Sequence, residues 1–172
     1  EDFCVLDGRR SHGRYDGSYE SIARTIRDYV SPSHLSAALE QFALTVAFSC
    51  GIGNGDAHRK NFSVCYRNPA GEVSLAPAYD LVATLPYLPA DTLALEMGGS
   101  KAFPDHARLL RFVRAVTGRN IRSAQQLLDQ ARHGVERVLE ETRDYGSRHK
   151  DAARFVESMT RVLGAGLARL VP

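Results

Sequence analysis

Two short segments near the middle of the chain hold side chains suited to catalysis. The loop Gly55–Phe62 contains Asp56 and Asn61, and the segment Ala78–Leu81 contains Asp80. An Asp, an Asn and a second Asp supply hard oxygen donors with no nearby zinc-ligand pattern of cysteines, which favours Mg²⁺ or Mn²⁺. Since Mg²⁺ takes few protein ligands and leaves the remainder to water and phosphate, these residues predict a magnesium and nucleotide site.

A predicted β-hairpin lies between the two segments. Apolar and polar residues alternate over 62–66, a turn is expected at 68–72, and apolar residues resume over 73–75. Two antiparallel strands carry the chain out and back. We therefore expect Asp80, just past the second strand, to return to the neighbourhood of Asn61.

The spacing of these residues matches the logic of a kinase catalytic loop. In such loops an Asp accepts the proton of the substrate hydroxyl, an Asn binds metal, and a later Asp binds metal between strands. Asp56, Asn61 and Asp80 fit these roles in turn. Lys60 is suited to neutralising the transferring phosphoryl group, and His58 to bracing the loop or contacting phosphate.

The sequence resembles the HipA-type serine/threonine kinase toxins of bacterial toxin–antitoxin modules. The resemblance rests on the two segments Gly55–Ser63 and Leu75–Leu81. Supporting motifs are Glu1–Cys4, Tyr15–Glu20 and Ala94–Gly99. The motifs lie in the first hundred or so residues, and the remainder matches only in its helical pattern.

The resemblance implies a fold that is mainly α with a few short β-strands, namely a protein-kinase-like C-terminal lobe. It implies ATP and Mg²⁺ as cofactors, Asp56 as the catalytic base, and Asn61 and Asp80 as the magnesium ligands. The residues that it places at the cofactor are His58, Arg59, Lys60, Asn61, Tyr79 and Asp80.

Function and partners also follow from the resemblance. Members of the family transfer the γ-phosphate of ATP to a Ser or Thr of a protein substrate, glutamyl-tRNA synthetase or similar, and so arrest growth. A HipB-like DNA-binding antitoxin neutralises them and forms an autorepressing complex with them on operator DNA. Arg108, Arg111 and Arg114 would form a basic helix face for such a complex.

The chain departs from the family in one respect. The family's glycine-rich nucleotide loop and strand lysine lie upstream of the segment that resembles Glu1. Here no glycine-rich loop precedes Asp56 at a kinase-like distance, and Lys60 is the only lysine before Lys101. The chain also begins without Met. We therefore expect residues 1–172 to be a single C-terminal lobe whose N-terminal lobe is absent, and which does not transfer phosphate alone.

Two other functions remain open at this stage. The chain could be a non-catalytic module that binds an antitoxin or DNA. It could also be a small-molecule phosphotransferase of the aminoglycoside type, which shares the Asp-x-x-x-x-Asn logic. Those enzymes usually begin the loop with His-Gly-Asp, whereas His58 follows Asp56 here.

Helices must position these loops. Apolar residues recur at helical spacing from Tyr19 to Val30 behind a capping Ser18, and a second, largely buried helix is expected from Pro32 to the glycines at 51–55. After an extended stretch at 92–97, helical patterns fill the remainder of the chain. They cover residues 109–118, 127–146 and 156–170.

Composition favours one globular, cytoplasmic domain. The 172 residues are 44% apolar and 24% charged, enough for a core without disulfides or metals. Three cysteines in no paired pattern favour a reducing compartment. The most apolar run, 42–52, is about half of the ~20 residues that a membrane helix needs, so no membrane span is expected. Residues 1–100 hold 8 Lys and Arg against 12 Asp and Glu, and residues 101–172 hold 14 against 8.

Overall fold

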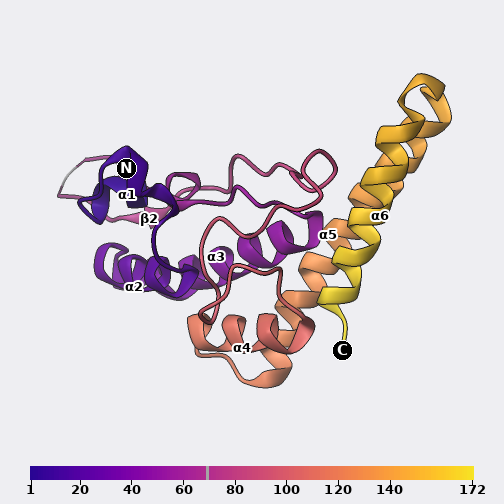
Figure 1. Cartoon of the computed structure of the whole chain (residues 1–172). Helices are drawn as coiled ribbons and strands as arrows, with labels where there is room; N and C mark the ends of the chain where they lie inside the picture. Colours follow the sequence, from indigo (N-terminus) through magenta and orange to yellow (C-terminus); the bar gives the residue numbers. More distant parts are fainter. Residues whose placement is uncertain (69) are drawn as a thin grey trace.

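The computed structural model describes residues 1–68 and 70–172, and most of them are helical (Figure 1). The first long helix, α2, covers Tyr19–Tyr29. Ser18 caps it as predicted: its hydroxyl accepts from the Ser21 N–H, and the Ser21 hydroxyl accepts in return from the Ser18 N–H. The reciprocal pair satisfies two N–H groups that a helix leaves free at its start.

The central helix, α3, covers Pro32–Ile52. It begins with Pro at the first helical position, where the missing N–H costs nothing, and ends at Gly53, whose φ of 71° is in the left-handed region. Figure 1 shows that its N-terminal end lies near the β-hairpin and its C-terminal end reaches α5 and α6. Both predicted helix boundaries are thus confirmed.

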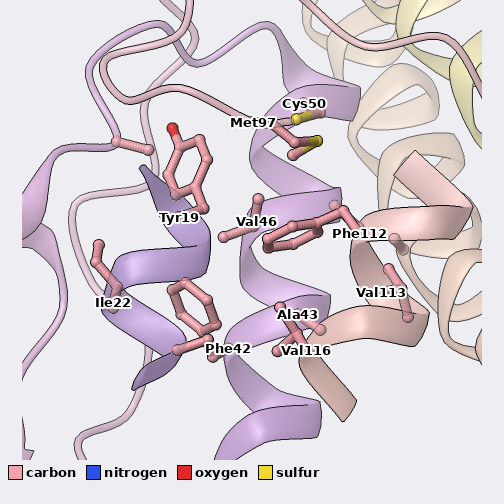
Figure 2. Close-up of a cluster of buried hydrophobic side chains, with 14 of the residues drawn as sticks. Tyr19, Ile22, Phe42, Ala43, Val46, Cys50, Met97, Phe112, Val113 and Val116 are labelled. Atoms are coloured by element: carbon pink, nitrogen blue, oxygen red, sulfur yellow. The ribbon is translucent and has the colours of Figure 1, made fainter. Parts of the chain in front are cut away.

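The centre of the core lies where α3 meets α2 and α4 (His106–Thr117). Figure 2 shows Val46 of α3 between Tyr19 of α2 and Phe112 of α4, with the Phe42 ring below Tyr19 and beside Ile22. The ring centroids of Phe42 and Tyr19 lie 6.3 and 6.2 Å from that of Phe112, both in edge-to-face arrangements. Such pairs add to the free energy gained by burial, so this contact fixes how the three helices cross.

Within the described residues, α3 is the helix long and apolar enough to cross a membrane by length and composition. Its apolar stretch is longer than the run 42–52 considered above. More than half of that stretch is buried inside the protein. Because the central helix of a packed core meets the same criterion, this feature is weak evidence for a membrane span.

Helices α5 (Ile121–Arg148) and α6 (Ala153–Leu170) form a long antiparallel pair that projects from the remainder of the molecule (Figure 1). All three helices predicted beyond Pro104 are present. Glycines let this pair approach α3 closely: a Cβ on Gly166 would overlap the carbonyl of Gly51, and a Cβ on Gly51 would lie 2.6 Å from Val135. The absence of side chains at the two glycines sets the helix separation.

The predicted hairpin is present but very short. Strand β1 (Val64–Cys65) pairs antiparallel with β2 (Ser74–Leu75), with Val64 opposite Leu75. The predicted turn includes Pro69, which lies outside the described residues. The extended stretch 92–97 forms no strand; it makes only isolated bridges.

The N-terminal segment lies along β1. The Glu1 ammonium donates to the Val64 carbonyl at 2.9 Å, and the Phe3 N–H donates to the Phe62 carbonyl at 3.1 Å. The short helix α1 (Phe3–Leu6) follows, and then a 3₁₀ turn over Ser11–Tyr15. Further 3₁₀ turns cover Arg59–Asn61 and Lys150–Ala152. The first of these is the loop that holds the predicted site.

Candidate active site

The loop that leaves α3 is fastened to the segment 84–91. The Gly53 carbonyl accepts from the N–H groups of Thr84 and Leu85 at 3.0 and 3.1 Å. The Gly55 N–H donates to the Thr84 hydroxyl at 2.8 Å, and that hydroxyl donates to the Asp91 carboxylate at 2.6 Å. A Cβ on Gly55 would overlap the Asp91 carboxylate. Only glycine permits this approach, which fixes where the next residue begins.

That next residue is Asp56, which is half-buried. Its N–H donates to the Asn54 side-chain oxygen at 2.9 Å, and its carbonyl accepts from the His58 N–H at 2.8 Å. The carboxylate oxygen Oδ1 accepts from the phenol of Tyr15 at 2.8 Å. Burial raises the pKa of Tyr15, and this hydrogen bond to Asp56 is the second cause of the rise. Backbone and carboxylate of Asp56 are therefore both held.

Asn61 and Asp80 are in direct contact. The Asn61 Nδ2 donates to the Asp80 carboxylate, although the two residues are 19 apart in sequence. The Asn61 Oδ1 accepts from the His58 N–H at 3.2 Å. Asp80 has a φ of 54°, which is uncommon for a residue with a Cβ and which turns its backbone sharply after Tyr79. The predicted return of Asp80 to Asn61 is confirmed.

The donor set of this pair suits Mg²⁺. Asp80 supplies carboxylate oxygens, and the Asn61 Oδ1 has a second lone pair beside the one that His58 uses. Within residues 1–68 and 70–172, no group of three or more His, Cys, Asp or Glu residues gathers in a metal-binding arrangement. Two protein oxygens are few for a zinc or calcium cage but match an ion that keeps water and phosphate as its other ligands.

Lys60 and Tyr79 lie next to the pair. The Lys60 ammonium donates to the Asp2 carboxylate at 2.9 Å. This hydrogen bond and, second, the negative charge of Asp2 raise the pKa of Lys60. The Tyr79 phenol donates to the Lys60 carbonyl at 2.7 Å and contacts the Ser63 hydroxyl. Burial raises the pKa of Tyr79. The two predicted cofactor residues are thus fastened to one another.

Arg59 is placed differently from the prediction that it contacts the cofactor. Its side chain is fully buried, and its guanidinium forms an ion pair with Asp7 and donates to the Asp16 carbonyl at 2.8 Å and to the Ser21 hydroxyl. Burial lowers the pKa of Arg59. Because these contacts occupy the guanidinium inside the protein, the side chain anchors the N-terminal segment beneath the loop.

His58 is buried with 9% of its surface exposed, and the edge of its ring meets the Tyr15 ring at 5.1 Å between centroids. Its Nδ1 is buried and has no hydrogen-bond partner among the described residues. The backbone of His58 bridges Asp56 to Asn61, as described above. The His58 backbone thus braces the loop, and the role of its side chain stays a prediction.

Asp56 opens into a hollow of about 440 Å³, and Asn61 and Asp80 are not among its lining residues. Tyr15 lines it on one side and Lys101 on another, where the Lys101 ammonium donates to the Tyr15 carbonyl at 3.2 Å. The carboxylate predicted as the base therefore lines this hollow, and the pair predicted to hold metal lies outside its lining.

Sequence reasoning gave no role to Tyr15, Asp2 or Asp7, which contact the loop residues through space. The motifs Glu1–Cys4 and Tyr15–Glu20 are a signal for Asp2 and Tyr15, and Asp7 lies in neither motif. Their partners lie 41 to 58 residues away, and spacing cannot reveal such pairs.

Comparison with known proteins places the chain in a family. The family model described as the HipA-like C-terminal domain matches residues 1–144. The chain therefore belongs to the HipA-like C-terminal domain family, as the sequence motifs implied.

Two proteins of Sinorhizobium fredii are similar in sequence. "Putative kinase Y4dM" is 40% identical over 106 residues, which are 59% of this chain and 24% of that protein. "Putative kinase Y4mE" is 33% identical over an alignment of 186 residues, covering 99% of this chain and 41% of that protein. The chain thus spans less than half the length of either relative.

A solved structure is similar in fold. It is HipA of Shewanella oneidensis MR-1, in a complex with HipB and its operator DNA. The TM-score is 0.65 at 20% sequence identity, and the match covers 94% of this chain and 37% of that one. The helical arrangement is therefore that of the corresponding part of HipA.

Proposed function

We propose that this chain is the C-terminal lobe of the kinase-like catalytic domain of a HipA-like toxin. With ATP and Mg²⁺, the complete gene product would transfer the γ-phosphate to a Ser or Thr of a protein substrate and arrest growth. The contact between Asn61 and Asp80 is the observation that carries the proposal, because it joins two oxygen-bearing residues at the base of the loop that starts with Asp56. The kinase names of the two relatives support it.

In this proposal each residue has a separate task. Asn61 and Asp80 hold Mg²⁺, which supplies positive charge to the phosphate oxygens when bound. The Asp56 carboxylate takes the proton of the acceptor hydroxyl as that oxygen bonds to the γ-phosphorus and the bond to ADP breaks. Lys60 and Tyr79 lie beside the nucleotide. His58 orders the loop between Asp56 and Asn61.

The proposal assigns the glycine-rich loop and the strand lysine of the kinase to a second lobe outside residues 1–172. Electrostatic stabilisation supplies most of the rate enhancement in phosphoryl transfer. Without the phosphate-binding groups of the second lobe, the groups in residues 1–172 do not stabilise the transition state sufficiently. Residues 1–172 alone are therefore expected to bind Mg²⁺ and nucleotide weakly and to transfer no phosphate.

Phosphorylation by the complete gene product tests the function. With γ-labelled ATP, Mg²⁺ and glutamyl-tRNA synthetase as the acceptor, the natural protein should label itself or the acceptor. Asp56→Asn should lower the rate by about a hundredfold or more, the usual contribution of a general base. The matched control is Asp151→Asn, an exposed Asp at the 3₁₀ turn between α5 and α6. Equal rates for Asp56→Asn and the natural protein would refute the role of Asp56.

We also propose a HipB-like antitoxin and, through it, operator DNA as partners. The HipA neighbour was solved with both. Arg111 and Arg114 are exposed on α4, whereas Arg108 is half-buried and donates to the Ala102 carbonyl. Growth arrest on expression should be relieved by the HipB-like protein, and the complex should shift operator DNA with a salt-dependent affinity. Persistent arrest would exclude that partner.

A further inference from the structure

The starting point is the hollow that Asp56 lines. It measures about 440 Å³, large enough for a side chain and part of its backbone, and it is bounded by Tyr15, Thr92 and Lys101 among others. Asn61 and Asp80 are outside its lining. If those two residues hold the metal, the nucleotide phosphates belong beside them, and the space at Asp56 is left for the molecule that receives the phosphoryl group, with its hydroxyl at the edge next to the phosphates.

Tyr15 determines how the Asp56 carboxylate is presented there. Its phenol donates to Oδ1 at 2.8 Å, and within the described residues Oδ2 has no hydrogen-bond partner. A carboxylate with one oxygen fixed cannot rotate freely, so the second oxygen keeps one direction. The free oxygen is the one available to an incoming hydroxyl.

The position of Tyr15 is itself fixed on three sides. Its ring meets the buried His58 ring edge-on, with the planes at 70°. Its carbonyl accepts from Lys101, and the next carbonyl, that of Asp16, accepts from the buried Arg59. Tyr15 is thus held by two residues of the loop that it contacts and by Lys101, which suits a residue whose task is orientation.

We propose that Tyr15 is a positioning residue that aims the Asp56 carboxylate into this hollow, and that the hollow receives the Ser or Thr segment of the protein acceptor. The proposal rests on the proposed kinase function. It adds a place for the acceptor and a residue that acts on the rate through Asp56.

The first test is Tyr15→Phe in the complete gene product. It removes the phenol oxygen and keeps the ring that meets His58. With glutamyl-tRNA synthetase as acceptor, kcat should fall about ten- to a hundredfold, the range for a displaced catalytic group, while the KM for MgATP stays within about twofold. Tyr145→Phe, on the projecting end of α5, is the control with natural kinetics.

A second readout reports the contact directly. In protein with labelled tyrosine ring carbons, the NMR titration of Tyr15 should move to lower pH in Asp56→Ala, because the acceptor and negative charge that favour its protonated form are lost. An unchanged Tyr15 titration would overturn the proposed contact in solution.

The second arm blocks the hollow. Thr92 is exposed and lines it, so Thr92→Trp should raise the KM for the acceptor about tenfold and leave the KM for MgATP unchanged. Ala90→Trp, two residues away and not among the lining residues, is the matched control. Equal effects of both changes would overturn the assignment of the hollow.

The outcomes separate this inference from the proposed function. A natural protein that labels nothing would refute the kinase function and the inference with it. An active natural protein with an equally active Tyr15→Phe variant would refute only the inference. Loss of MgATP affinity in Tyr15→Phe would also refute it, since Tyr15 would then act on the nucleotide side.

Discussion

Around the candidate site buried polar contacts add to the apolar core, whereas α4, α5 and α6 are held by apolar packing. Near the site, Arg59 is buried against Asp7 and Ser21, and the loop after α3 is fastened through Thr84 and Asp91. The helices beyond residue 105 bury apolar stripes, and their charged pairs are on the surface.

The difference follows from what each region must do. Directional hydrogen bonds place individual atoms, as the site requires, but an unpaired buried partner is costly. Apolar packing is tolerant of detail and supplies most of the stability. We therefore expect the site region to be sensitive to loss of single polar atoms and the helical region to be sensitive to added volume.

The largest effect is expected at Arg59. Arg59→Met removes the buried guanidinium, leaves the Asp16 carbonyl without its donor, and leaves the half-buried Asp7 carboxylate with only the Thr25 hydroxyl and Arg9. It should lower the free energy of unfolding by about 3 kcal/mol, the lower end for loss of one partner of a buried ion pair. Urea unfolding measures it. Arg24→Met, at an exposed position on α2, should change stability by less than about 0.5 kcal/mol.

The double change Arg59→Met with Asp7→Leu sharpens this prediction. Removing both charges avoids leaving the half-buried Asp7 carboxylate without its main partner, so part of the lost stability should return. If the double variant is no more stable than Arg59→Met, the ion pair is not the source of the effect.

A smaller effect is expected where α6 meets α3. Gly166→Ala forces a methyl group against the Gly51 carbonyl and should lower stability by about 1–3 kcal/mol. The matched control is Gly164→Ala on the same helix, where nothing lies within 4 Å of the added Cβ. That change should raise stability by about 0.5–1 kcal/mol. Thermal unfolding of the two variants should therefore shift in opposite directions.

The smallest effect concerns Asp2 and pH. Although burial opposes it, the hydrogen bonds from Lys60 and the Val5 N–H hold the pKa of Asp2 below 3.8. Because its folded-state pKa is lowered, Asp2 contributes stability that is fully present above pH 3.8. This stability is lost as the pH falls through the folded-state pKa. The natural protein should exceed Asp2→Asn in stability at pH 6, and the gap should close below pH 3.8. A gap that is constant with pH would exclude the ion pair as its cause.

Much of the fold could be predicted because it depends on local signals. Ser18, Pro32 and Gly53 mark helix ends through backbone chemistry that needs no distant partner. The stretch 92–97 was less predictable: its alternating apolar residues suggest a strand, but they are buried without a neighbouring strand to pair with. Whether an extended segment becomes a strand depends on a partner elsewhere in the chain.

The sequence by itself determined the helices, the hairpin that returns Asp80 to Asn61, and the family. Only the tertiary structure decided that Arg59 faces inward and that Tyr15 holds Asp56. The physical reason is that a charged or phenolic side chain can face water or protein with similar local geometry. The choice between them depends on whether a carboxylate from a distant segment stands within hydrogen-bond reach.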